Sequence, residues 1–233
     1  MLHSTISVIG RGRMGIALAA ALRAPAPLGR GSDGADAELM FVGEAPGANE
    51  DKLGLPFVGR AGQLLETLLG EIGLARDDVF IANTLKCRPP GNRDPLPLEL
   101  ENCRDYLLAQ LDLIQPKVVC TLGNFATKLL RDDATGITRL HGQAEIRTIG
   151  ARTVRLYPLL HPAAALYTRS NVEVLREDFA RIPELLALPA PRQHDRPADM
   201  AADEVAAAET PPAAVADPQQ AAGAAVDDQL DLF

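Results

Sequence analysis

The sequence predicts an α/β fold of three layers, in which a central, mostly parallel sheet is covered by helices on both faces. Short apolar segments of strand length alternate with longer segments of helical periodicity along most of the chain. The strand segments are apolar at nearly every position, which is typical of parallel strands buried on both sides. We find no internal repeat that would indicate a solenoid or a propeller.

The first half of the pattern contains two strands and two helices. Residues 39–43 form an apolar strand that ends in a glycine turn, and residues 79–83 form a second strand. Between them, residues 62–74 place leucines and an isoleucine on one helical face. A second helix is expected over residues 98–114, because two prolines stand directly before its start.

The second half repeats the alternation. Residues 117–122 predict a third strand, and a short helix over residues 124–130 follows it. Residues 154–160 predict a further strand, and residues 172–186 a closing helix. Four strands with helical connections of this length are typical of a parallel sheet.

Composition divides the chain into three regions. We expect an atypical head over residues 1–37, a folded domain over residues 38–188, and a disordered tail over residues 189–233. The tail is rich in Ala, Pro, Asp and Gln and has no periodic apolar face, so burial could not offset its ordering entropy. It also holds nine acidic residues and two arginines, and therefore most of the net charge of −8. The acidity consequently does not exclude a local basic surface on the folded domain.

Several classes of protein are excluded by simple features. No apolar run is long enough to span a membrane, and arginines interrupt the apolar stretch near the start, unlike a secretory signal. We therefore expect a cytoplasmic monomer that does not bind membranes. Three cysteines, Cys87, Cys103 and Cys120, are too few for a disulfide framework, and Cys120 reads as a core residue.

Polar clusters follow three of the predicted strands. They are residues 43–51 (Gly-Glu-Ala-Pro-Gly-Ala-Asn-Glu-Asp), Asn83, and residues 161–165 (His-Pro-Ala-Ala-Ala). Ligands of open α/β sheets lie outside the carboxyl ends of the strands, so we expect these clusters to form one site.

The residue types in these clusters suit a nucleotide or another polyanion. The glycines let backbone N–H groups approach a ligand, Asn83 can read a base edge, and His161 can stabilise a developing oxyanion. Phe57 lies in a loop and could stack on a base. The basic residues expected to hold phosphates are Arg60, Lys86, Arg88, Arg93 and Arg169, with Leu166 as the candidate to fill the gap that a flipped base leaves. Taken alone, each has an ordinary structural explanation as a turn, core or surface residue.

Three motifs together resemble the iron–sulfur, bacterial and archaeal family 4 of uracil-DNA glycosylases. Residues 43–51 with 54–62 (Gly-Leu-Pro-Phe-Val-Gly-Arg-Ala-Gly) resemble its first motif. Residues 83–93 (Asn-Thr-Leu-Lys-Cys-Arg-Pro-Pro-Gly-Asn-Arg) resemble its middle segment, and residues 161–165 its second catalytic motif. The resemblance spans about residues 38–186 and implies an enzyme of base-excision repair that acts on single- and double-stranded DNA.

The same resemblance implies a role for each site residue. The turn of Gly43, Glu44 and Ala45 contacts the uracil, Phe57 stacks on it, and Asn83 reads its Watson–Crick edge. His161 hydrogen-bonds the uracil carbonyl as negative charge builds on the leaving base, and Glu50 steadies the sugar cation or positions water. Ala45 stands where better-known uracil glycosylases carry a water-activating Asp.

The resemblance further implies a 4Fe–4S cluster held by four cysteines, and this sequence departs from it. Cys87 and Cys103 match one pair of ligands, and the N-terminal Cys-x-x-Cys of the family is missing. Residues 7–15 (Ser-Val-Ile-Gly-Arg-Gly-Arg-Met-Gly) look instead like the opening of a dinucleotide-binding domain. No second strand with an acidic residue follows, so a foreign or misassigned head explains them better than an NAD site.

Three other functions stay open beside an active glycosylase. They are a non-catalytic DNA-binding or clamp-associated module, an NAD-dependent oxidoreductase, and a relative that traps the abasic product covalently, for which His141 would be the only nucleophile candidate. The last five residues, Gln229, Leu230, Asp231, Leu232 and Phe233, resemble the motif by which bacterial repair proteins bind the β sliding clamp.

Overall fold

A computed structural model describes residues 37–193 of the chain. Its centre is a five-stranded sheet in the order β2-β1-β3-β5-β4. The strands are β1 (Leu39–Gly43), β2 (Phe80–Asn83), β3 (Val118–Leu122), β4 (Glu145–Ile149) and β5 (Arg152–Leu159). Four of them are parallel and β4 is antiparallel to β5. The predicted α/β fold with a mostly parallel sheet is therefore confirmed.

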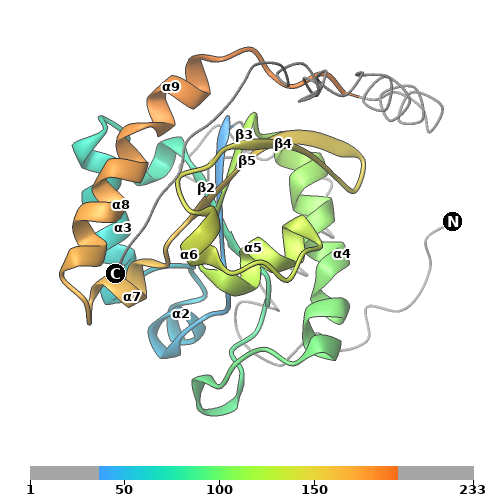
Figure 1. Cartoon of the computed structure of the whole chain (residues 1–233). Coiled ribbons are helices and arrows are strands. Elements are labelled where there is room, and N and C mark those ends of the chain that lie inside the picture. Colours follow the sequence, from blue (N-terminus) through green and yellow to red (C-terminus); the bar gives the residue numbers. More distant parts are fainter. Residues whose placement is uncertain (1–36, 194–233) are drawn as a thin grey trace, which may run out of the picture. The chain divides into compact units, whose positions relative to one another are not determined.

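Helices α3 (Arg60–Glu71), α8 (Ser170–Ala180) and α9 (Ile182–Ala187) cover one face of the sheet (Figure 1). Alternate strand residues such as Phe41, Cys120 and Tyr157 point to this side and pack against buried leucines of α3. The rings of Phe41 and Phe179 stack at 5.7 Å between centroids, which joins the sheet to α8.

Helices α4 (Pro97–Ile114) and α5 (Asn124–Arg131) cover the other face. The intervening strand residues, among them Met40, Val119 and Leu156, pack here against buried side chains of both helices. Because successive side chains of a strand alternate in direction, the burial of every residue of β1 and β3 is explained by helices on both sides.

The short elements gather mostly at the strand ends. Helix α2 (Ala48–Leu53) follows β1, and α7 (Pro162–Ala165) follows β5. The 3₁₀ turns η1 (Arg76–Asp78) and η2 (Pro90–Asn92) lie before and after β2, and α6 (Ile137–Leu140) precedes β4. In Figure 1, α2 and α7 lie together at the lower end of the sheet. The elements after β1 and β5 therefore meet at one edge of the fold.

The structure differs from the prediction in one strand and one helix. Strand β4 was not predicted, and the helix predicted over residues 172–186 is two helices, because α8 ends at Ala180 and Pro183 stands in the first turn of α9. Of the predicted regions, the head and the tail lie outside the described residues, except for Ala37 and residues 189–193. Within the described part, no helix is long and apolar enough to cross a membrane.

Candidate functional site

The carboxyl ends of β1, β2, β3 and β5 lie side by side, so the residues that follow them share one end of the sheet. Pairing of the backbone continues past the strands. The N–H groups of Thr84 and Leu85 donate to the carbonyls of Gly43 and Glu44 at 2.9 Å, and Gly123 N–H donates to Leu159 O at 2.9 Å. These bonds fix the loops that carry the predicted site residues.

Gly43 lies at the point where two of these side chains meet. A Cβ atom at this position would lie 2.6 Å from the Asn83 side-chain oxygen and 2.6 Å from the Phe57 ring, closer than real contacts allow. The Phe57 ring in turn lies 5.7 Å from the His161 ring between centroids, at an interplanar angle of 24°. The structure thus brings together Gly43, Phe57, Asn83 and His161.

Asn83 is 1% exposed, and its Oδ1 atom has no hydrogen-bond partner within the described part of the chain. An unsatisfied buried acceptor costs free energy, so such atoms in native proteins usually have a function. The Asn83 side chain therefore offers an acceptor that a ligand at this end of the sheet could use.

His161 caps the start of α7, where its Nδ1 atom accepts a hydrogen bond from Ala163 N–H at 3.0 Å. An accepting Nδ1 leaves the ring proton on Nε2. Burial lowers the pKa of His161 to about 4, so the ring is neutral near pH 7. The site therefore offers a neutral N–H donor whose tautomer is set by the backbone.

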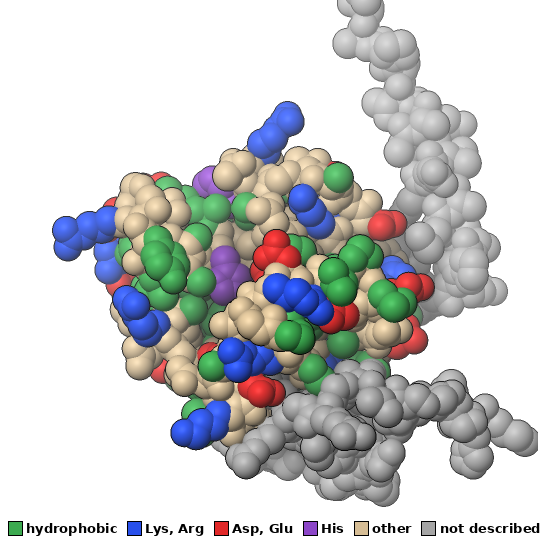
Figure 2. All heavy atoms as spheres, turned by 90° about the horizontal axis from the view of Figure 1, so that it is seen from below, with side chains coloured by type: hydrophobic (Ala, Val, Ile, Leu, Met, Phe, Trp, Pro, Cys, Tyr) green, Lys and Arg blue, Asp and Glu red, His purple; other side chains and the backbone are tan. Residues whose placement is uncertain are grey.

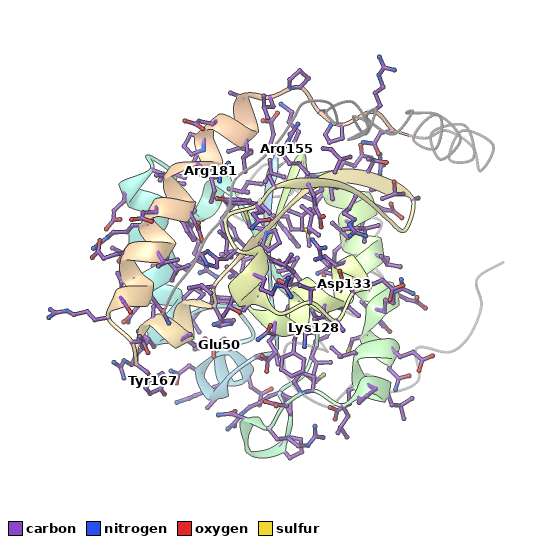
Figure 3. All side chains as sticks on the ribbon, viewed as in Figure 1. Glu50, Lys128, Asp133, Arg155, Tyr167 and Arg181 are labelled. Carbon is purple, nitrogen blue, oxygen red and sulfur yellow. The ribbon has the colours of Figure 1, made fainter. Side chains whose placement is uncertain are left out.

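The two predicted carboxylates have different surroundings. Burial, with a smaller effect of Asp94, raises the pKa of Glu44 above its usual range. Glu50 accepts hydrogen bonds at Oε1 from the N–H groups of Val58 and Gly59, at 3.0 and 2.8 Å. Figure 3 shows Glu50 on α2, on the side toward α7. Glu50 therefore holds the loop that carries Phe57.

The predicted DNA-binding residues do not behave alike. Arg60 and Arg169 are exposed, while Arg88 is half-buried and donates to Asn92 Oδ1 at 2.6 Å. Figure 2 shows lysine and arginine side chains around a face on which a histidine lies in a hollow. Leu166 is half-buried, and its neighbour Tyr167 is 88% exposed at the outer edge of α7 (Figure 3).

The predicted phosphate contact of Lys86 is wrong for this structure. Lys86 is 3% exposed, and its Nζ atom donates to Asn83 O at 2.7 Å and to Gln110 Oε1 at 2.6 Å. Burial lowers its pKa to about 7. Lys86 joins the end of β2 to α4, so it supports the site from behind and does not face DNA.

The cysteines do not form the donor set of a four-thiolate cluster. Cys87 is half-buried, Cys103 is buried on α4, and Cys120 is fully buried in the middle of β3, where burial raises its thiol pKa. Between residues 37 and 193, no three His, Cys, Asp or Glu side chains are grouped so that they could hold a metal ion. The sequence contains no other cysteine, so the residues present do not fit a 4Fe–4S cluster.

Sequence reasoning missed two glycines of the site. Gly123 has φ +86°, and a Cβ there would lie 3.1 Å from His161 Cβ. At Gly62 a Cβ would lie 1.9 Å from Phe57 O. A glycine directly after the third strand was a signal that could have found Gly123, because a glycine also ends the first strand at Gly43.

His141, the candidate for covalent trapping, is engaged elsewhere. Its Nδ1 atom lies 2.9 Å from Asp178 Oδ2, and Asp178 belongs to α8. The five C-terminal residues of the predicted clamp motif and the dinucleotide-binding pattern of the head lie outside the described residues.

Comparisons with known proteins match this geometry. The model of the uracil DNA glycosylase superfamily matches residues 29–184, which is more than half of the chain. The type-4 uracil-DNA glycosylase of Sulfurisphaera tokodaii is 48% identical over 158 residues, covering 66% of this chain and 72% of the relative. That of Archaeoglobus fulgidus is 46% identical over 164 residues, covering 68% and 82%. The type-5 enzyme of Pyrobaculum aerophilum is 32% identical over 163 residues, covering 63% and 71%. The aligned region contains all three motifs and the convergent strand ends, and the chain belongs to the uracil-DNA glycosylase superfamily.

Proposed function

We propose that this chain is an active uracil-DNA glycosylase of type 4, which removes uracil from DNA in base-excision repair. The observation that carries the proposal is the meeting of Gly43, Phe57, Asn83 and His161 around an unsatisfied buried acceptor. The relatives named type-4 uracil-DNA glycosylase, at 44–48% identity, support the same substrate.

Base recognition follows from the hydrogen-bonding groups of uracil. Asn83 Oδ1 accepts the N3–H of the flipped base, and the amide N–H donates to O4. Cytosine has an acceptor at N3 and a donor at C4, so it would leave the buried amide unpaired, and such mismatches discriminate strongly. Phe57 stacks on the base, and the missing side chain at Gly43 lets the Phe57 ring and the Asn83 amide approach this turn closely.

Cleavage breaks the bond between C1′ and N1, and the electron pair stays with uracil. His161 donates a hydrogen bond from Nε2–H to the carbonyl O2 as negative charge develops there. The histidine ring itself is neutral. Water then adds to C1′, and the proton that it loses balances the charge of the uracil anion, so the products are an abasic deoxyribose and neutral uracil. Because Ala45 has no carboxylate, Glu44 and Glu50 are the carboxylates available to steady the sugar cation or orient the water.

The wider assignment follows the same lines. We propose a glycosylase domain over residues 38–188 that acts as a cytoplasmic monomer, with Arg60, Arg88 and Arg169 on phosphates. No chemical step uses a cluster.

The C-terminal pentapeptide would bind the β sliding clamp, which a titration of clamp against the chain and its Leu232→Ala, Phe233→Ala variant measures. If the chain and the variant bind the clamp equally, the pentapeptide is not a clamp-binding motif.

The direct test is uracil release from single- and double-stranded oligonucleotides, with cytosine and thymine oligonucleotides as controls. We expect an abasic product from uracil alone, with Asn83→Ala strongly impaired. A folded chain that binds these oligonucleotides and releases no uracil would favour the non-catalytic module instead.

A further inference from the structure

The backbone of Phe57 has an unfavourable conformation. Its φ angle is +52°, in the left-handed region, although the residue carries a bulky side chain. Side chains with a Cβ rarely adopt this conformation unless their surroundings enforce it, and such residues concentrate at functional sites. The loop of residues 56–59 therefore needs contacts with the rest of the protein that keep it in this conformation.

One side of the loop is held by Glu50 and Gly62. Glu50 Oε1 accepts the N–H groups of Val58 and Gly59, directly after Phe57. Gly62, at the start of α3, lets the Phe57 carbonyl approach so closely that any Cβ would collide with it at 1.9 Å. These contacts fix the amide groups that follow Phe57.

The other side is held by Arg76 of η1. Its two terminal nitrogens donate to successive carbonyls of the loop, Nη1 to Phe57 O at 3.0 Å and Nη2 to Pro56 O. A planar guanidinium suits two acceptors at fixed spacing better than a lysine ammonium does. Nη1 also donates to Glu66 Oε1 at 3.2 Å, an ion pair that lies at the surface.

We propose that Arg76 is a positioning residue for uracil binding, which acts through the Pro56 and Phe57 carbonyls to hold the Phe57 ring against the base. The proposal rests on the proposed function, since Phe57 is the stacking residue there. Arg76 itself is 29% exposed in its side chain, and both of its terminal nitrogens are committed to protein acceptors. It lies just before β2, so it also ties the Phe57 loop to the strand that ends in Asn83.

The test compares Arg76→Met with Glu66→Gln. The first removes the two loop contacts and the ion pair, whereas the second weakens only the ion pair. Misplacing a positioned group by about 1 Å can cost roughly 10²-fold in rate, so we expect a 10- to 100-fold lower kcat/KM for Arg76→Met. Glu66→Gln should stay within about twofold of the wild type, because exposed ion pairs contribute little.

A Phe57→Ala background separates positioning from general stability. If Arg76 acts through the ring, Arg76→Met causes little further loss in that background, as coupled residues do in a double-mutant cycle. A full independent loss there, or full activity of Arg76→Met alone, would overturn the proposal. Should Arg76→Met fail to fold, Arg76→Lys serves in its place, with a smaller loss expected from its single donor group.

Hydrogen exchange of a peptide covering residues 54–62 gives a readout that needs no activity. Arg76→Met should raise exchange at the Val58 and Gly59 amides, and Glu66→Gln should leave it unchanged. Unchanged exchange in both variants would show that Glu50 and Gly62 hold the loop without Arg76, which contradicts the proposed role of Arg76. Absence of uracil release by the wild type would overturn the proposed function, while the exchange result would still decide whether Arg76 holds the loop.

Discussion

The strand-end residues and the two cysteines Cys87 and Cys103 both belong to stretches that resemble the family's motifs, but the structure gathers several side chains around the first and no metal-binding group of described residues around the second. At the strand ends, Gly43, Phe57, Asn83 and His161 meet, and an acceptor is left for a ligand. Around Cys87 and Cys103 no third ligand is present among the described residues, and Lys86 bonds β2 to α4 there. The comparison shows that each set of residues depends on its own contacts, so the strand-end arrangement forms without a metal-binding group among the described residues.

The largest effect should come from His161→Ala, which removes the ring N–H donor from the strand-end site. Loss of one oxyanion donor typically lowers a rate by about 10²–10³. Single-turnover release of uracil at saturating enzyme measures it, with thermal unfolding as a check on the fold. A rate within a few-fold of the wild type would show that another group supplies the donor.

The pH dependence should be the next largest effect. His161 has a pKa of about 4, so the ring stays neutral from pH 8 down to about pH 5. Protonation of Nδ1 near pH 4 removes the acceptor for Ala163 N–H that holds the ring in place, so we expect activity to fall there. The unfolded chain protonates this ring below its ordinary pKa of 6.5, so the free energy of unfolding falls as the pH drops from about 6.5 toward 4. The Glu44 pKa is raised, so this carboxyl could also cause a loss of activity at low pH. A Glu44→Gln variant, whose side chain does not titrate, separates that contribution from the one of His161. A loss of activity centred near pH 6.5, in both the wild type and Glu44→Gln, would contradict the lowered pKa of His161.

A moderate effect is expected at the rim of the site. If Leu166 fills the gap left by the flipped base, Leu166→Ala should slow release from double-stranded DNA by roughly several-fold and spare single strands, because only the duplex has a stack to repair. Tyr167→Ala is the matched control at the neighbouring exposed position. Equal losses on both substrates would assign Leu166 to packing.

The smallest effect should come from replacing Cys87 and Cys103. The double variant Cys87→Ser, Cys103→Ser should keep its rate within about twofold, and the anaerobically purified wild type should lack a stoichiometric cluster. Iron and sulfide analysis with an absorbance spectrum measures this. A full 4Fe–4S centre would show that ligands outside the described residues complete the shell and would remove the contrast between the two regions.

The sequence predicted the parts of the fold that rest on periodic burial. The apolar strands and the long helices repeat at a regular spacing, and the strand-end rule placed Asn83 and His161 correctly at one end of the sheet. Strand β4 escaped because its residues alternate in burial and include Arg147 and Glu145, which resemble a surface loop. The break before Pro183 escaped because the apolar spacing continues across it.

Other residues could not be predicted because their partners are remote in sequence. Lys86 can be buried because Asn83 O and Gln110 Oε1, the latter on a different element, accept hydrogen bonds from its Nζ atom. Arg76 acts on backbone carbonyls nearly twenty residues earlier, and such contacts leave no pattern of side-chain types. Reading Lys86 as an exposed phosphate contact was therefore a natural error for a basic residue beside a predicted site.

The antiparallel strand β4 has one more consequence, for the solubility of the protein. It lies at the edge of the sheet beside β5, so the strand that leads to His161 is internal and has a neighbour on each side. On β4, Glu145 bonds Arg131 and Arg147 and places charge along the open border. Charged side chains on an edge strand discourage pairing with a strand from another molecule. The polar strand that sequence patterns overlooked thus protects this border against edge-to-edge aggregation.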